Sequence, residues 1–173
     1  MTPKFIAAAL AIIAAPALAQ EQKTLESKPL DAPASMQTAS DRVLASDPQS
    51  FVSFFEVSGL PARLTEDTVG DPLVEYRSNG DKMSLFFYDC EDNVDCQAVQ
   101  FYAGYRAGNV SLETINSWNT DRRFVRAYLT DEGVARIEMD VATSLDGLSH
   151  RDFDALLDLW LDSVVLFEDH INW

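Results

Sequence analysis

Two cysteines and four acidic residues lie close together in the stretch YDCEDNVDC, which runs from Tyr88 to Cys96. Cysteine thiolates can form a disulfide, exchange electrons or bind zinc. In an exported chain, two cysteines across a hairpin most simply form a disulfide. We therefore expect Cys90 and Cys96 to be linked, with a gain in stability of only about 2 kcal/mol because the closed loop is short.

Two other kinds of chemistry at this stretch are weaker alternatives. A redox-active pair is usually closer in sequence and lies at a helix N-terminus, and zinc needs about four ligands while both histidines lie far along the chain. The oxygen donors at alternate positions resemble the start of a calcium loop, although Val94 replaces the glycine of the sharp turn and Gln100 replaces the bidentate glutamate. These donors are Asp89, Glu91, Asn93 and Asp95.

The segment INSWN and the arginines after it form the only local basic cluster on a very acidic chain. Such a patch could bind an acidic group or a partner peptide. The alternative is structural, with the asparagines satisfying backbone groups at a helix end and the tryptophan in the core. The candidate residues are Asn116, Trp118, Asn119, Arg123 and Arg126.

Signatures of catalysis are missing from the sequence. There is no nucleophile elbow, no metalloprotease motif and no phosphate-binding glycine loop. Asp154, Asp158 and Asp162 recur every four residues, a spacing that is more typical of a solvated helix face than of paired acids. We therefore expect no enzyme activity and no cofactor.

The elements that position these residues follow from hydrophobic periodicity. Asn79-Gly80 and the 131–133 turn predict two hairpins, and pairing Cys90 with Cys96 aligns the apolar residues of successive strands on one face. Residues 48–58, 111–121 and 149–171 are predicted helices, with Asp47, Ser111 and Ser149 as caps. The expected fold class is α+β, an antiparallel sheet with helices packed mainly on one face.

The opposite face of this sheet is predicted to carry aromatic and charged residues together with both cysteines. Contiguous exposed aromatic side chains usually mark contacts, so this face is a candidate partner surface or homodimer surface. Its candidate partner-binding residues are Tyr88, Tyr102 and Tyr128.

The N-terminus predicts export. Lys4, the apolar run after it and the cleavage site near Ala19 form a secretory signal peptide over residues 1–19, followed by a disordered linker at 20–45 and one domain at 46–173. The mature chain is expected in a bacterial periplasm or secreted, without membrane insertion. The whole chain has a net charge of −15, which disfavours nucleic acid as a partner.

The order of several motifs resembles the YbjN-domain family, which is described as bacterial sensory transduction regulators. The motifs are Gly70-Asp71-Pro72, LFFYDC, the cysteine-bounded hairpin, NSWN, RRFVRAYL, EMDV and the last helix. The resemblance implies a fold similar to type III secretion chaperones, which dimerise and bind peptides, and implies no enzyme activity. Those chaperones work in the cytoplasm, whereas this chain carries an export signal.

Together these observations predict an exported, non-enzymatic binding or regulatory module with a protein or peptide partner. The alternative is a small periplasmic protein that binds a metal or ligand through the acidic hairpin at 89–95.

Overall fold

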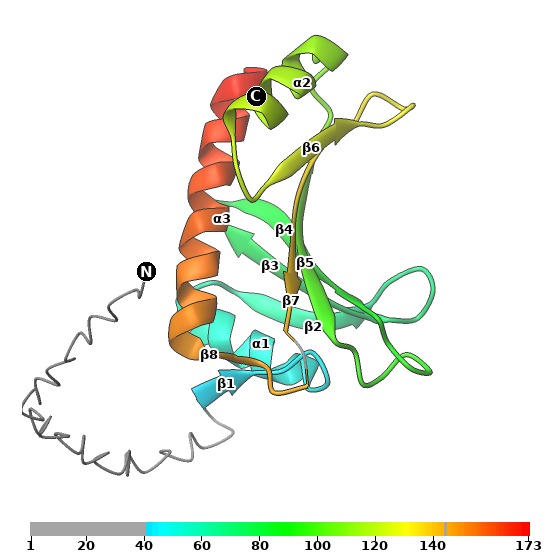
Figure 1. Cartoon of the computed structure of the whole chain (residues 1–173), viewed down its shortest axis with the longest axis vertical. Coiled ribbons are helices and arrows are strands. Elements are labelled where there is room, and N and C mark those ends of the chain that lie inside the picture. Colours follow the sequence, from blue (N-terminus) through cyan, green and yellow to red (C-terminus); the bar gives the residue numbers. More distant parts are fainter. Residues whose placement is uncertain (1–40, 144) are drawn as a thin grey trace, which may run out of the picture. The chain divides into compact units, whose positions relative to one another are not determined.

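The structure is a computed structural model, and it describes residues 41–143 and 145–173 (Figure 1). The predicted signal peptide at 1–19 and most of the predicted linker, residues 20–40, lie outside the described residues. The described part confirms the α+β class, because a six-stranded antiparallel sheet is combined with three helices.

The described residues form two short outer strands, three helices and the six strands of the main sheet. Their bounds are β1 (Arg42–Val43), α1 (Pro48–Val57), β2 (Ala62–Glu66), β3 (Pro72–Ser78), β4 (Asp81–Tyr88), β5 (Ala98–Tyr105), α2 (Leu112–Asp121), β6 (Arg126–Leu129), β7 (Ala135–Ala142), β8 (Leu148–Ser149) and α3 (His150–Ile171).

The main sheet has the strand order β2-β3-β4-β5-β7-β6, with every neighbouring pair antiparallel. The predicted register is confirmed in both hairpins: Val74 pairs with Leu85, and Arg126 pairs with Glu138. The turn between β3 and β4 is the predicted one, since Asn79 and Gly80 both have positive φ, as a two-residue hairpin turn requires.

The core lies between one face of the sheet and the helices. In Figure 1, α3 runs along this face of the sheet, with α1 and α2 near its two ends. The apolar stripe of α3 supplies Phe153, Trp160 and Phe167, which are all fully buried. Phe101 of β5 stacks on Phe153 and Trp160 at centroid distances of 5.5 and 5.6 Å, so the middle of the sheet packs against the first half of the helix.

All three helices begin directly after the predicted cap residues, but only two of the three caps form. The Ser111 and Ser149 side chains accept hydrogen bonds from the backbone of Thr114 and Asp152, as N-caps do. Asp47 was predicted as a cap, but its side chain makes no capping hydrogen bond. Pro48 occupies the first turn, and the N–H of Ser50, which a capping side chain would bind, donates instead to the backbone carbonyl oxygen of Asp47.

The predicted linker boundary at residue 45 is wrong at its C-terminal end, because Val43 and Ala45 are buried. Residues 42–43 form β1, which pairs with β8 in a separate two-stranded sheet. Arg42 also donates hydrogen bonds to the carbonyl oxygens of Asp146 and Gly147. Gly147 has a φ of +65°, and a Cβ there would lie 2.3 Å from the Val43 carbonyl oxygen. The close approach of the two backbones at this position therefore requires glycine.

Candidate partner-binding surface

One face of the main sheet carries no helix in the described part of the chain. Side chains alternate along a strand, so the residues that do not enter the core gather on this opposite face. We call it the open face. Its central residues lie on β4, β5, β7 and β6, and they are Phe86, Tyr88, Gln100, Tyr102, Arg126, Tyr128, Arg136, Glu138 and Asp140.

A continuous chain of polar contacts crosses the open face from β4 to β6. The Tyr88 hydroxyl donates to Gln100 Oε1 at 3.3 Å, and Gln100 Nε2 donates to Asp140 Oδ1 at 2.7 Å. Arg126 bridges Asp140 and Glu138 with separate nitrogens. Four strands are therefore linked by side chains as well as by their backbone ladder.

Glu138 lies near the β6 end of this chain, and only 5% of its surface is exposed. A buried carboxylate is costly unless it is paired and hydrogen-bonded. One of its oxygens accepts the Tyr128 hydroxyl at 2.7 Å, and the other accepts Arg126 Nη2 at 2.7 Å and Nε at 3.1 Å. Both oxygens are thus satisfied, which explains how an acid can be buried on this face of the sheet.

The aromatic side chains are held by a second set of contacts. The Arg136 guanidinium lies 5.6 Å from the Tyr102 ring centroid and 5.7 Å from that of Tyr128, a cation–π arrangement on both sides. Phe86 meets Tyr102 edge to face at 5.4 Å. A Cβ on Gly104 would lie 2.8 Å from the Tyr102 hydroxyl, so glycine at this position provides the space for the tyrosine.

Two tyrosines and two arginines of the open face keep one protonation state around neutral pH. Burial raises the pKa of Tyr128 and that of Tyr88 above their ordinary values, so both hydroxyls remain protonated donors. Hydrogen bonds to Glu138 and Tyr128 raise the pKa of Arg126 and that of Arg136, respectively, so both guanidinium groups remain charged.

Four of the sequence-predicted partner residues come together on the open face: Tyr88, Tyr102, Tyr128 and Arg126. Tyr88 is the most exposed of the three tyrosines, with 43% of its surface accessible. Sequence reasoning did not identify Gln100, which links Tyr88 to Asp140. The signal was available, because the predicted strand register places Gln100 on the same face as Tyr102.

The other predicted partner residues lie elsewhere, and two of them have structural roles. Trp118 is 1% exposed, and its indole N–H donates to the Val125 carbonyl oxygen. The Asn119 amide both donates to and accepts from the backbone of Ala127, at 2.9 Å each. Asn116 and Arg123 are exposed outside the open face.

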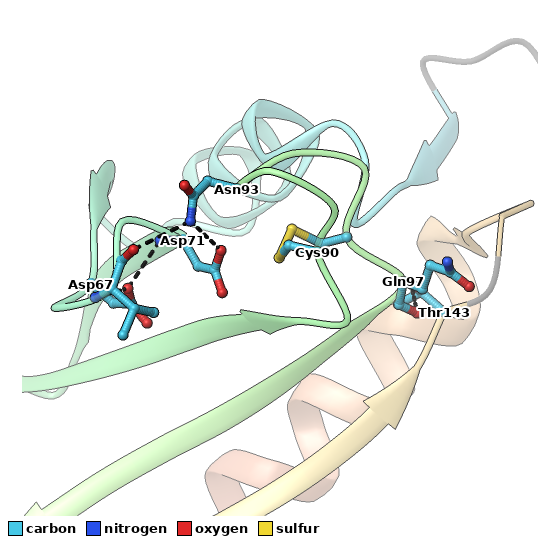
Figure 2. Close-up of a disulfide and its surroundings, with 8 residues drawn as sticks. Asp67, Asp71, Cys90, Asn93, Gln97 and Thr143 are labelled. Atoms are coloured by element: carbon cyan, nitrogen blue, oxygen red, sulfur yellow. Dashed lines mark hydrogen bonds between the residues drawn. A yellow bond between two sulfur atoms is a disulfide. The ribbon is translucent and has the colours of Figure 1, made fainter.

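The disulfide between Cys90 and Cys96 is present, but the predicted placement of the cysteines on the open face is wrong (Figure 2). Cys96 is buried in the hydrophobic core, and Cys90 packs against it. Both cysteines lie in the connection between β4 and β5, outside the two strands. Asp89 and Asp95, which are their neighbours in sequence, have positive φ. Each left-handed residue interrupts the alternation of side chains, so the cysteines turn toward the core.

The acidic hairpin is shaped by turns and not by a cluster of carboxylates. Asp92 and Asn93 both have positive φ between Glu91 and Val94, which exchange backbone hydrogen bonds. Asn93 donates its amide to Asp71 Oδ1 at 2.8 Å, which joins this hairpin to the turn between β2 and β3 (Figure 2). Within the described residues, no three His, Cys, Asp or Glu side chains lie together as metal ligands would.

Comparison with known proteins identifies one family. The model of the YbjN family, described as "Putative bacterial sensory transduction regulator", matches residues 48–173. A search of curated proteins found no significant match. Among the helices of the described part, none has both the length and the apolar character needed to cross a membrane. The family match covers all three helices and the whole main sheet, and the chain therefore belongs to the YbjN family.

Proposed function

We propose that the protein is an exported, non-enzymatic regulatory module that binds a protein or peptide partner through the open face. The observation that carries this proposal is the group of Tyr88, Tyr102 and Tyr128 with Arg136 on a sheet face that no described helix covers. Tyrosine and arginine are the side chains most enriched where binding energy concentrates in protein interfaces. Contiguous accessible aromatic side chains also mark contact surfaces on soluble proteins.

The contacts within the open face favour binding in a second way. Gln100, Glu138 and Asp140 hold their neighbours by hydrogen bonds before any partner arrives. Ordering a long side chain on binding costs roughly 0.5–1.5 kcal/mol, so a surface that is already ordered keeps more of its contact energy. The open face is therefore suited to a partner that contacts a rigid, flat surface.

The family supports the regulatory part of the proposal, since its description names regulators and no catalytic activity. Export rests on the predicted signal peptide at 1–19. The Cys90–Cys96 disulfide supports it, because such bonds persist in oxidising compartments and are rare in the cytosol. Regulation in this compartment would act through a binding event on the folded domain.

The test is affinity capture of the tagged protein from its own periplasm, with two matched variants. Tyr88→Glu places a charge on the open face, and Leu166→Glu places one on the exposed side of α3. The two positions are 43% and 41% exposed, so both changes should leave the fold intact. We expect a partner that is retained by Leu166→Glu and lost by Tyr88→Glu. Equal retention by both variants would place the partner elsewhere.

Two further measurements complete the test. Light scattering decides whether the partner is a second copy, since a homodimer through the open face would dissociate in Tyr88→Glu. Cell fractionation with N-terminal sequencing tests export, and we expect a periplasmic chain that begins near Gln20. A cytoplasmic chain with free thiols at Cys90 and Cys96 would contradict the export part alone.

A further inference from the structure

The two edge strands of the main sheet differ in how far their outward-facing backbone groups are covered. The edge strand β6 is capped at Ala127, because the Asn119 amide occupies the outward-facing backbone N–H and C=O of that residue. Covering a strand edge protects it from pairing with another chain. The opposite edge strand, β2, has no such cover within the described part of the chain.

The hydrogen-bond pattern shows which backbone groups of β2 are free. Pro61 and Asp67, which flank the strand, both bond to the β3 side, with Arg77 N–H donating to Pro61 O and Asp67 N–H donating to Asp71 O. Antiparallel ladders alternate, so the odd-numbered residues between them also bond to β3. The backbone groups of Ala62, Leu64 and Glu66 therefore point outward from the sheet, and within the described residues none of them has a partner.

Positive charge is concentrated on the open-face side of this edge. Arg63, Arg77 and Lys82 line a hollow with a volume of about 290 Å³, together with a single carboxylate, Glu75. Arg63 and Lys82 both pair with Glu75, yet their side chains remain 72% and 54% exposed. Three cations and one anion leave this corner positive on a chain whose net charge is −15.

The helix side of the edge carries Ala62, Leu64 and Glu66, with the apolar Leu64 in the middle. Leu64 points to the helix side of the sheet, opposite Val74, and remains 43% exposed. A strand added beside β2 would place alternate side chains next to Leu64 and next to the positive corner. The matching sequence would alternate apolar and acidic residues.

We propose that the outer edge of β2 accepts an extended, acidic peptide segment of a partner protein as a seventh strand. Strand addition of this kind takes its affinity from main-chain hydrogen bonds and its specificity from alternate side chains. A second copy of β2 fits less well, because antiparallel pairing centred on Leu64 would place the two Arg63 side chains on the same face as diagonal neighbours. The proposal goes beyond the proposed function, since it concerns the sheet edge and not the open face.

The experiment uses the purified full chain and two synthetic eight-residue peptides. One alternates valine with glutamate, and the other alternates valine with lysine. We expect calorimetric binding of the glutamate peptide only. We also expect hydrogen exchange at the Leu64 amide to slow on binding, because that N–H would donate to the added strand. Binding of both peptides alike, or of neither, would overturn the proposal.

Two variants locate the binding site. Leu64→Pro removes an outward N–H without touching the β2–β3 ladder, and proline is tolerated on edge strands for this reason. Loss of one main-chain hydrogen bond should weaken the affinity for the glutamate peptide about fivefold, and the proline ring adds a steric obstacle. The double variant Arg77→Gln, Lys82→Gln should also weaken the affinity for the glutamate peptide. It leaves the backbone of β2 unchanged, so it remains informative if Leu64→Pro folds poorly. Arg106→Gln, on an exposed arginine elsewhere, should have no effect.

The outcomes separate this site from the open face. Tyr88→Glu should bind the glutamate peptide as the wild type does, even if it loses the partner of the open face. Unchanged peptide binding in Leu64→Pro would show that the edge is not the site. A homodimer that Leu64→Pro dissociates, with no peptide bound, would assign the edge to a second copy and overturn the proposal.

Discussion

The amide of Asn119 offers the sharpest test of how the sheet edge is protected. Its side chain makes two hydrogen bonds with the backbone of Ala127, both at 2.9 Å, whereas the Asn116 side chain, one helical turn earlier, makes none in the described part of the chain. Both asparagines are exposed residues of α2. They differ in this contact, so each alanine variant is a control for the other.

The size of the effect follows from the two hydrogen bonds. A hydrogen bond contributes roughly 0.5–1.5 kcal/mol to stability, and partial exposure favours the lower half of that range. Asn119→Ala should therefore reduce the free energy of unfolding by about 1–2 kcal/mol. Asn116→Ala should change it by less than about 0.5 kcal/mol, as surface substitutions usually do.

Urea denaturation followed by circular dichroism measures both variants. The midpoint should fall for Asn119→Ala while the dependence of the free energy on urea stays constant, because the same surface is exposed on unfolding. Equal midpoints for the two variants would refute the idea that Asn119 caps the β6 edge.

Three further predictions follow from the same structure. Replacing Cys90 and Cys96 together by serine should lower the free energy of unfolding by about 2 kcal/mol. In urea titrations, reductant should lower the free energy of unfolding of the wild type by the same amount and leave that of the variant unchanged. Glu138→Gln should cost about 1–2 kcal/mol because it weakens the hydrogen bonds of Arg126 and Tyr128, while Glu132→Gln on an exposed turn should cost almost nothing. The pKa of Glu75 is lowered below its ordinary value of 4.5, mainly by its hydrogen bond with Lys82, so the ionised form stabilises the fold above that pH and this stability is lost as the pH falls below it. Glu75→Gln should therefore show a shallower loss of stability than the wild type in denaturation between about pH 5 and pH 3, and parallel curves would contradict the assignment.

Much of the fold could be predicted from the sequence because local signals and long-range pairing agree. The turn at Asn79-Gly80 fixes one hairpin, and alternation of apolar residues fixes the partner of each residue, such as Val74 with Leu85. The same alternation brought Tyr88, Tyr102 and Tyr128 to one face. Period-two patterns determine both the register and the face, so one correct pairing predicts many others.

The details that were missed depend on single backbone conformations and on contacts distant in sequence. The positive φ of Asp89 and Asp95 turns the cysteines toward the core, and nothing in the residue types distinguishes such aspartates from those in ordinary turns. The burial of Val43 depends on pairing with β8 more than a hundred residues away. The use of the Asn119 amide to cap β6 likewise requires the position of α2 relative to the sheet, which periodicity does not supply.

The most direct test of the open face as a partner-binding surface is photo-crosslinking in living cells. A photoreactive phenylalanine analogue replaces Tyr88 in one strain and Leu166 in another, since these positions have similar exposure on opposite sides of the domain. We predict a discrete crosslinked product from position 88, with another protein or a second copy of the chain, and none from position 166. A product from position 166 alone, or no product at position 88, would contradict the proposed function.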